Sequence, residues 1–138
     1  MIQTIKAKIK ELLDGVDEIV QVFEYPENNP TGYPYAFITW EGNESSELTN
    51  AQDSIYLTYK ITLVQEKLAA FKGKKEAEIT TEDRAWKIET LFREDNDLGL
   101  ADVLRVLPVN TEKIYDAEAT RIILEVTLQV HTFADVTI

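Results

Sequence analysis

The strongest constraint on the fold is a two-residue alternation in two segments of the chain. In Ser54–Gln65 every second position is apolar and the positions between are mostly polar, and Thr120–Phe133 repeats the pattern over a longer run. Successive side chains of a β-strand point to opposite faces of the sheet. The two segments therefore predict an antiparallel sheet with one face on a core and one face toward solvent or a neighbour. Thr120–Phe133 exceeds the usual strand of about six residues, so its end is expected to project from the domain.

Two segments have the apolar spacing of amphipathic helices. In Ile2–Leu13 the apolar residues recur every three or four positions with lysines between them, and Gly15 follows as the expected end. A second helix is predicted at Thr81–Glu94, with Thr80 or Thr81 as its cap and acidic residues in its first turn, where the helix dipole favours negative charge.

The remaining chain divides into short strands and polar connections. Strands are predicted at 20–23, Tyr35–Trp40 and Val103–Val109. Glu41–Asp53 has almost no large apolar side chain and is predicted to be a loop, and Gln65–Thr80 is predicted to be a charged connection.

These elements follow one another as helix, three strands, helix and two strands. The order predicts one α+β domain over residues 1–138, with a mainly antiparallel sheet of four to five strands and two helices packed on one face. A chain of 138 residues with 44% hydrophobic residues has the apolar material for one core.

Composition excludes several classes of site and of partner. The chain has no cysteine, which removes disulfides, thiolate metal sites and cysteine nucleophiles. The first ten residues are amphipathic, and no run approaches the roughly 18 apolar residues of a membrane span. We therefore expect a soluble protein with no membrane partner.

Charge is strongly negative and unevenly distributed. The formal net charge is −11, which argues against ordinary nucleic-acid binding because such binding needs clustered cations. Between Glu11 and Tyr59 there is no Lys or Arg, although acidic residues recur throughout. Two interpretations remain open at this point: a solvated surface, or a surface that repels phosphate or binds a basic partner.

A search for catalytic, cofactor-binding and metal-ligating patterns finds none. The single histidine, His131, lies on the polar side of the last strand, and no Gly-x-Ser-x-Gly elbow accompanies it, which favours a surface or interface histidine. The segment Asp95–Gly99 places its glycine one position too early for a calcium loop, and Val106 stands at the twelfth position. Lys72–Lys75 lacks the glycine spacing of a phosphate-binding loop. We expect no cofactor and no enzymatic activity.

Aromatic residues gather near the second predicted strand: Tyr25, Tyr33, Tyr35, Phe37 and Trp40. Packing in the core and turns is favoured over a binding platform. Alternation places Tyr35 and Phe37 on one face of this strand and Trp40 on the other, so both faces carry apolar side chains and both need cover. A helix layer covers one face, and a partner subunit is the candidate for the other.

The order and size of these elements resemble the tail-terminator (tail-completion) proteins of long-tailed bacteriophages. The resemblance rests on the opening helix, the aromatic segment Tyr33–Trp40 followed by Ser54–Gln65, the helix containing Ala85-Trp86-Lys87-Ile88, and the closing strand Ile122–Phe133. It implies a virion protein, assembled in the host cytoplasm, at the head-proximal end of the tail. Its homo-hexameric ring would cap the tail tube protein, join it to the head-tail connector protein and let DNA pass without specific binding.

A ring with head-to-tail contacts needs two different patches on each subunit. One candidate patch comprises Tyr35, Phe37, Trp40, Glu41, Glu44 and Glu47, and the other comprises Lys72, Lys74 and Lys75. Three alternatives stay open: a neighbouring component of the head-tail neck, a small acidic adaptor that binds a basic protein through Glu41–Asp53, and an enzyme with a carboxylate site.

Overall fold

A computed structural model describes residues 1–27, 29–47 and 52–135, and the side chains of these except 45–47, 52, 53 and 133–135. The elements in chain order are α1 (Ile2–Asp14), β1 (Gln21–Phe23), β2 (Tyr35–Glu47), β3 (Gln52–Lys67), the 3-10 turn η1 (Leu68–Ala70), α2 (Lys74–Glu94), β4 (Val103–Tyr115) and β5 (Arg121–Asp135). No helix in the described ranges is long and apolar enough to cross a membrane.

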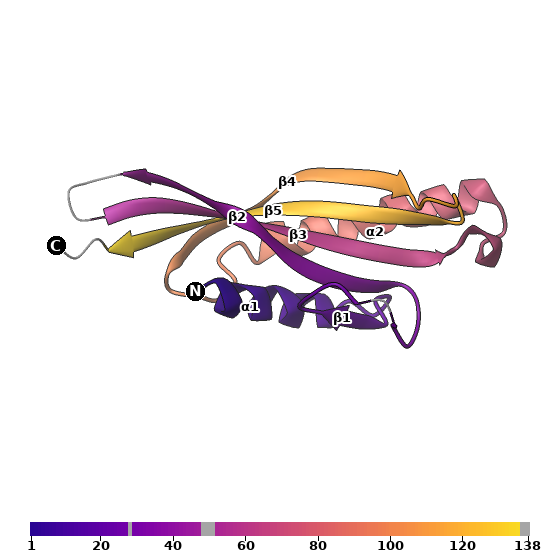
Figure 1. Ribbon diagram of the computed structural model, residues 1–138, viewed down its shortest axis with the longest axis horizontal. Coiled ribbons are helices and arrows are strands. Elements are labelled where there is room, and N and C mark those ends of the chain that lie inside the picture. The colour runs from indigo at the N-terminus through magenta and orange to yellow at the C-terminus, as the bar shows by residue number, and fades with distance from the viewer. Residues whose placement is uncertain (28, 48–51, 136–138) are drawn as a thin grey trace.

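The strands form one five-stranded sheet in the order β1-β2-β3-β5-β4. Only β1 and β2 run parallel, and the other neighbours are antiparallel. Both helices pack against the same face of the sheet (Figure 1). The predicted α+β class, with a mainly antiparallel sheet and two helices on one face, is confirmed.

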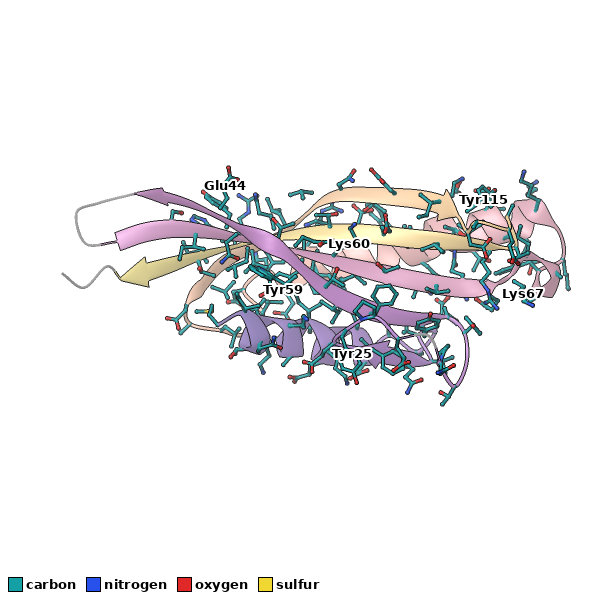
Figure 2. All side chains as sticks on the ribbon, in the orientation of Figure 1. Tyr25, Glu44, Tyr59, Lys60, Lys67 and Tyr115 are labelled. Atoms are coloured by element: carbon teal, nitrogen blue, oxygen red, sulfur yellow. The ribbon has the colours of Figure 1, made fainter. Side chains whose placement is uncertain are left out.

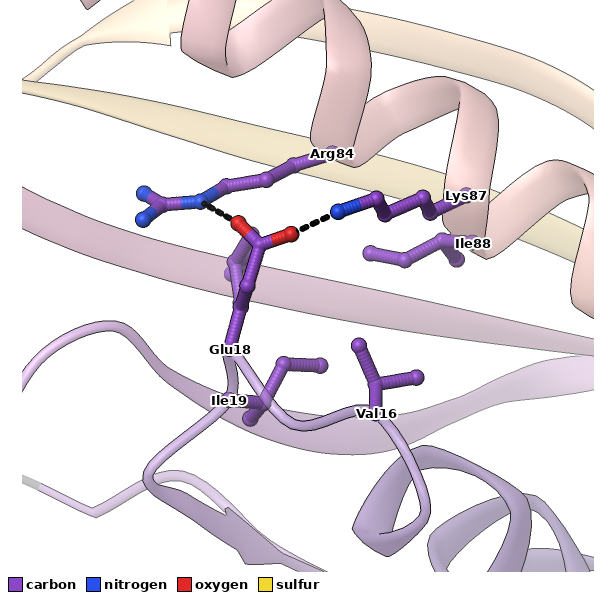
Figure 3. A pocket seen from close by; sticks show the side chains of 7 residues that line it. Val16, Glu18, Ile19, Arg84, Lys87 and Ile88 are labelled. Carbon is purple, nitrogen blue, oxygen red and sulfur yellow. Dashed lines mark hydrogen bonds and ion pairs between the residues drawn. The ribbon is translucent and has the colours of Figure 1, made fainter.

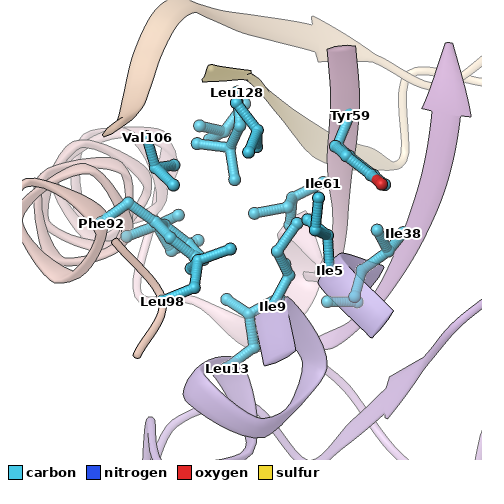
Figure 4. Close-up of a cluster of buried hydrophobic side chains, with 14 of the residues drawn as sticks. Ile5, Ile9, Leu13, Ile38, Tyr59, Ile61, Phe92, Leu98, Val106 and Leu128 are labelled. Carbon is cyan, nitrogen blue, oxygen red and sulfur yellow. The ribbon is translucent and has the colours of Figure 1, made fainter. Parts of the chain in front are cut away.

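The core lies between the helices and the sheet (Figure 4). Alternate residues of β3 and β5 point into it, as their apolar positions predict, and α1 and α2 contribute their apolar stripes from the other side. The fully buried side chains include Ile5 and Ile9 of α1, Ile61 of β3, Phe92 of α2 and Leu128 of β5. Two well-separated helices are thus joined to the sheet through one continuous apolar layer.

The opposite face of the sheet, named the open face below, carries no helix in the described structure (Figure 1). Polar residues of β3 and β5 occupy it at the positions that alternate with the core, as in Lys60, Glu125 and Thr127. The sheet is therefore half-covered, which is the arrangement that the period-two pattern predicts.

The segment 41–53 differs from the sequence prediction, because its described part is strand rather than loop. Pairing between β2 and β3 continues past a register shift at Trp40/Gly42 as far as Glu47 opposite Asp53, and β5 pairs with the other side of β3. A backbone ladder does not need apolar side chains, so polar residues extend a strand once its neighbour holds the register. The resulting three-stranded arm, residues 42–47, 52–57 and 130–135, projects past the helices (Figure 1), as expected for the end of the last strand.

The predicted start of the second helix is also wrong. Helix α2 begins at Lys74, after Gly73 at φ 126°, a backbone conformation that favours glycine. Thr81 lies inside the helix, where its hydroxyl donates to the carbonyl oxygen of Ala77 at 2.8 Å and accepts from the amide of Gln65 at 2.8 Å. The first turns carry good helix formers but bury only Ala77, so they have no apolar stripe to reveal them.

Candidate assembly surfaces

The two predicted charged patches lie at opposite ends of the molecule. Glu44 belongs to the arm, whereas Lys67 ends β3 at the far end of the sheet, next to η1 (Figure 2). That turn leads into three exposed lysines, named the lysine tip: Lys72, Lys74 and Lys75. The fold therefore does not bring the acidic and basic patches together within one copy.

The acidic residues of the first patch have different surroundings. Glu41 contacts Lys60 at 3.2 Å, and Lys60 also lies 3.8 Å from Glu125 on the open face. The hydrogen bond that Lys60 donates to Glu41 and then the charge of Glu125 raise the pKa of Lys60. Glu44 is exposed. The side chain of Glu47 lies outside the described residues.

The aromatic residues divide between packing and exposure. Tyr35 is 7% exposed, and its ring contacts Tyr33 edge-on at a centroid distance of 5.4 Å. Its hydroxyl donates to the backbone carbonyl of Glu27 at 3.1 Å, and burial raises the pKa of that hydroxyl. The guanidinium of Arg121 stacks 3.8 Å from the Tyr33 ring centroid. Tyr35 therefore holds the connection between β1 and β2 against the sheet and is not available to a partner.

Phe37 and Trp40 emerge on opposite faces, as the alternation predicts. Phe37 is half-buried beside Tyr35. Trp40 is 42% exposed, pairs in register with buried Tyr59, and donates its indole N–H to Asn43 at 2.8 Å. Trp40 is thus an accessible aromatic side chain on the helix-covered side, at the outer strand β2.

Two strand edges are unpaired in the described structure, and the sequence prediction did not identify them. β4 is the last strand on one side of the sheet. On the other side, β1 pairs with β2 only at 35–37, which leaves residues 38–47 of β2 without a neighbour. Exposed apolar side chains line β4, among them Leu104, Val109 and Ile114. Pro108, which cannot donate to a ladder, was the available signal that this strand lies at an edge.

Helix α2 is held to the rest of the fold by a nearly buried arginine (Figure 3). Arg84 donates to the carboxylates of Glu66 at 2.7 Å and Glu18 at 3.0 Å and to the amide oxygen of Gln65 at 2.8 Å. Lys87 forms a further ion pair with Glu18. The cavity beside these groups holds about 10 Å³, roughly the space of one water molecule. The charged groups therefore bind one another and serve the packing of α2.

This network makes stability depend on pH. Hydrogen bonds from Lys87 and Arg84 lower the pKa of Glu18 below 4.5. Burial alone would raise the pKa of Glu66, but the hydrogen bond and charge of Arg84 outweigh it and lower that pKa. Carboxylates with a lowered folded-state pKa stabilise the fold above their unfolded pKa and lose that contribution as the pH falls through the folded value.

We therefore expect the stability difference between the wild-type chain and an Arg84→Ala variant to be constant near neutral pH and to shrink below about pH 4.5. Urea denaturation of both proteins at a series of pH values measures this difference. The comparison cancels the effects of the many other carboxylates. A difference that grows on acidification would contradict the assignment.

His131 lies at the base of the arm on the open face. Its ring stacks on Tyr56 at a centroid distance of 4.4 Å and an angle of 13°, and its Nε2 contacts the hydroxyl of Ser54. The predicted surface histidine is thus engaged with two side chains of β3. Within the described ranges, no group of three or more His, Cys, Asp or Glu residues is arranged to hold a metal ion.

A shallow hollow of about 290 Å³ lies on the helix side between α2 and the end of α1. Val16, Leu91 and Trp86 form its apolar part, and Trp86 is 66% exposed. Unlike Trp40, this tryptophan belongs to a helix and not to the free part of a strand.

Comparison with known proteins adds a likeness in fold. No protein-family model matches the sequence, and no curated protein matches it. Among solved structures, a chain from the virion of a native gene transfer agent (GTA) particle matches with a TM-score of 0.66 and 9% sequence identity, covering 94% of each chain. The chain is therefore similar in fold, over almost its entire length, to a chain of that virion.

Proposed function

We propose that this chain is a structural subunit of a phage-like virion. The observation that carries the proposal is the likeness in fold to a chain of a gene transfer agent virion over 94% of both chains. The order of elements, which resembles that of tail-terminator proteins, agrees with it. Within the virion we propose a tail terminator: a non-catalytic ring subunit that caps the tail tube and joins it to the head connector.

The two ends of the molecule suit such a position. Glu44 in the arm and Lys67 at the end of β3, from which η1 leads to the lysine tip, lie at opposite ends of the long axis (Figure 2). If the strands run along the channel of a ring, these ends face different neighbours, the tail tube on one side and the head connector on the other. In that arrangement the lysine tip and the far end of the arm bind successive components, and the strand edges remain for adjacent subunits.

The open face suits the wall of a DNA channel. In the part of this face from the arm to the Glu112–Glu125 pair, the described charged side chains, placed there by strand register and by the contact of Glu41 with Lys60, are four acids and two bases: Glu41, Glu44, Glu112, Glu125, Lys60 and Arg105. This gives that part a formal charge of −2, counting histidine as neutral, whereas the end of the same face toward the lysine tip carries Lys67 and Arg121. A negative wall repels phosphate and lets DNA pass without adhering. This places the acidic residues inside the proposed ring.

The proposal is tested by measuring mass and shape. We expect native mass spectrometry and light scattering, over a range of protein concentration and salt, to show six-membered rings, and negative-stain images to show closed rings with a central hole. Added tail tubes should acquire one ring at a single end. Rings that bind only the connector would instead indicate a neighbouring neck component. A monomer that stays monomeric at high concentration and ignores tail-tube protein would refute the ring.

A further inference from the structure

We propose that the free edge of β4 pairs with the free edge of β2 in a second copy of this chain, with Arg105 facing Glu44 and Pro108–Val109 facing Trp40. The inference rests on the proposed function, because it names the contact by which ring subunits join. It uses two different patches of the same molecule, as a head-to-tail ring contact requires.

Strand direction permits this contact. The four strands β2, β3, β5 and β4 are successively antiparallel. Because four is an even number, β2 and β4 run in opposite directions. A second copy placed beside the first in the same orientation therefore presents its β2 antiparallel to β4. The sheet continues from copy to copy with the same ladder pattern.

On the open face, one row of paired residues across the sheet ends in opposite charges. Glu44 pairs in register with Tyr56, Tyr56 with His131, and His131 with Arg105. Glu44 and Arg105 are both exposed, and neither has a hydrogen bond or ion pair with another side chain in the described part of the chain. A neighbour added without a shift along the strands places its Glu44 directly opposite Arg105, and opposite charges at such positions attract.

On the helix side, a second row ends in exposed apolar groups. Trp40 pairs with Tyr59, Tyr59 with Leu128, and Leu128 with Pro108. Trp40 is 42% exposed, and Val109, next to Pro108, is 52% exposed. The same unshifted neighbour brings its Trp40 against this part of β4. An aromatic ring beside a proline and a valine would bury apolar surface that water contacts in the single copy.

The two contacts select the same register. The rows lie three residues apart on β4, from Pro108 to Arg105, and four apart on β2, from Trp40 to Glu44, where the register shift between Trp40 and Gly42 inserts one extra residue. A shift of two residues would retain the faces but lose both contacts. The remaining part of each edge is consistent with this register. β1 already pairs with β2 at Phe37. The row of Phe37 ends on β4 at Glu112, beyond the register shift between Pro108 and Asn110.

Engineered cysteines test this register, since the natural chain has none. In one copy, positions 44 and 105 are separated by three strand spacings, roughly 14 Å, which exceeds the roughly 7 Å reach of a disulfide. Cross-strand neighbours have Cα atoms about 4.5–5.5 Å apart, which a disulfide spans. We expect the full-length E44C/R105C protein, oxidised at high concentration, to give a ladder of covalent multimers on a non-reducing gel.

Matched variants define the alternatives. In E44C/E112C the second cysteine lies on the same face of β4 but in a different row of paired residues, so no ladder is expected. The single variants E44C and R105C can form at most a covalent dimer and should give no ladder either. A ladder from E44C/E112C would overturn the register. Rings seen by light scattering without a ladder from E44C/R105C would overturn this contact but leave the proposed function intact. Neither rings nor ladder would refute both.

A charge exchange gives a second readout on the same contact. R105E should lower the association constant of the ring by about tenfold, because it replaces an attraction with a repulsion. The exchange E44R/R105E should restore association to within a few-fold of the natural chain. Circular dichroism checks that these exposed substitutions leave the fold unchanged. Equal weakening in the single and exchanged variants would contradict the pairing.

Discussion

Replacing Phe92 with alanine is expected to lower the free energy of unfolding by about 3–5 kcal/mol. Phe92 is 0% exposed and packs in the core shared by α2 and the sheet (Figure 4). Removing its ring loses apolar burial and leaves a cavity that the surrounding strands cannot fill. Urea denaturation followed by circular dichroism measures the change.

The matched control lies on the same helix. Trp86 is the larger aromatic residue, but 66% of its surface is exposed, so Trp86→Ala is expected to cost less than about 1 kcal/mol. The comparison separates burial from side-chain size. Similar losses for the two variants would mean that α2 presents a different face to the sheet.

Replacing Arg84 with alanine is expected to lower the free energy of unfolding by about 2–4 kcal/mol. The substitution leaves Glu66 without its cation and Glu18 with Lys87 alone, although the two carboxylate side chains are only 30% and 33% exposed. It also removes a donor to Gln65, whose amide bridges to Thr81 and to the backbone of β5. An unpaired charge in such surroundings costs more than the pair contributes.

Lys87 provides the control for this second prediction. It binds the same Glu18, but its side chain is 56% exposed. Lys87→Ala should therefore change stability by no more than about 0.5–1 kcal/mol. The same urea series measures both variants. A loss of stability at Lys87 as large as that at Arg84 would show that the exposed ion pair, rather than the buried hydrogen bonds of Arg84, holds α2 in place.

The stability predictions and the proposed subunit contact concern different parts of the molecule. Phe92 and Arg84 act on the helix side and inside the fold, whereas Glu44 and Arg105 lie at opposite ends of one row on the open face. Variants of the first kind should destabilise the subunit, and variants of the second kind should leave it folded but weaken its association with a neighbour. This separation lets a defect in ring formation be assigned to the contact itself.

Sequence alone determined the fold class and the faces of the sheet. The alternation in β3 and β5 placed residues such as Ile61 and Leu128 in the core and Lys60 on the open face, because side chains on a strand alternate by geometry. The spacing of Ile5 and Ile9 likewise identified the buried side of α1. The aromatic strand showed apolar side chains on both faces, and the structure places Phe37 and Trp40 accordingly.

Element boundaries and edges depended on tertiary structure. The polar residues in 41–47 form a strand by pairing with β3, and the first turns of α2 bury a single alanine. Neither segment therefore has a periodic apolar pattern from which it could be predicted. Strand order brings Glu44 and Arg105 into one row, although they are far apart in the chain and no local pattern links them. Local periodicity indicates which side of an element is buried. Strand order and register arise from contacts between distant segments, so only the folded chain determines which strand edges remain free.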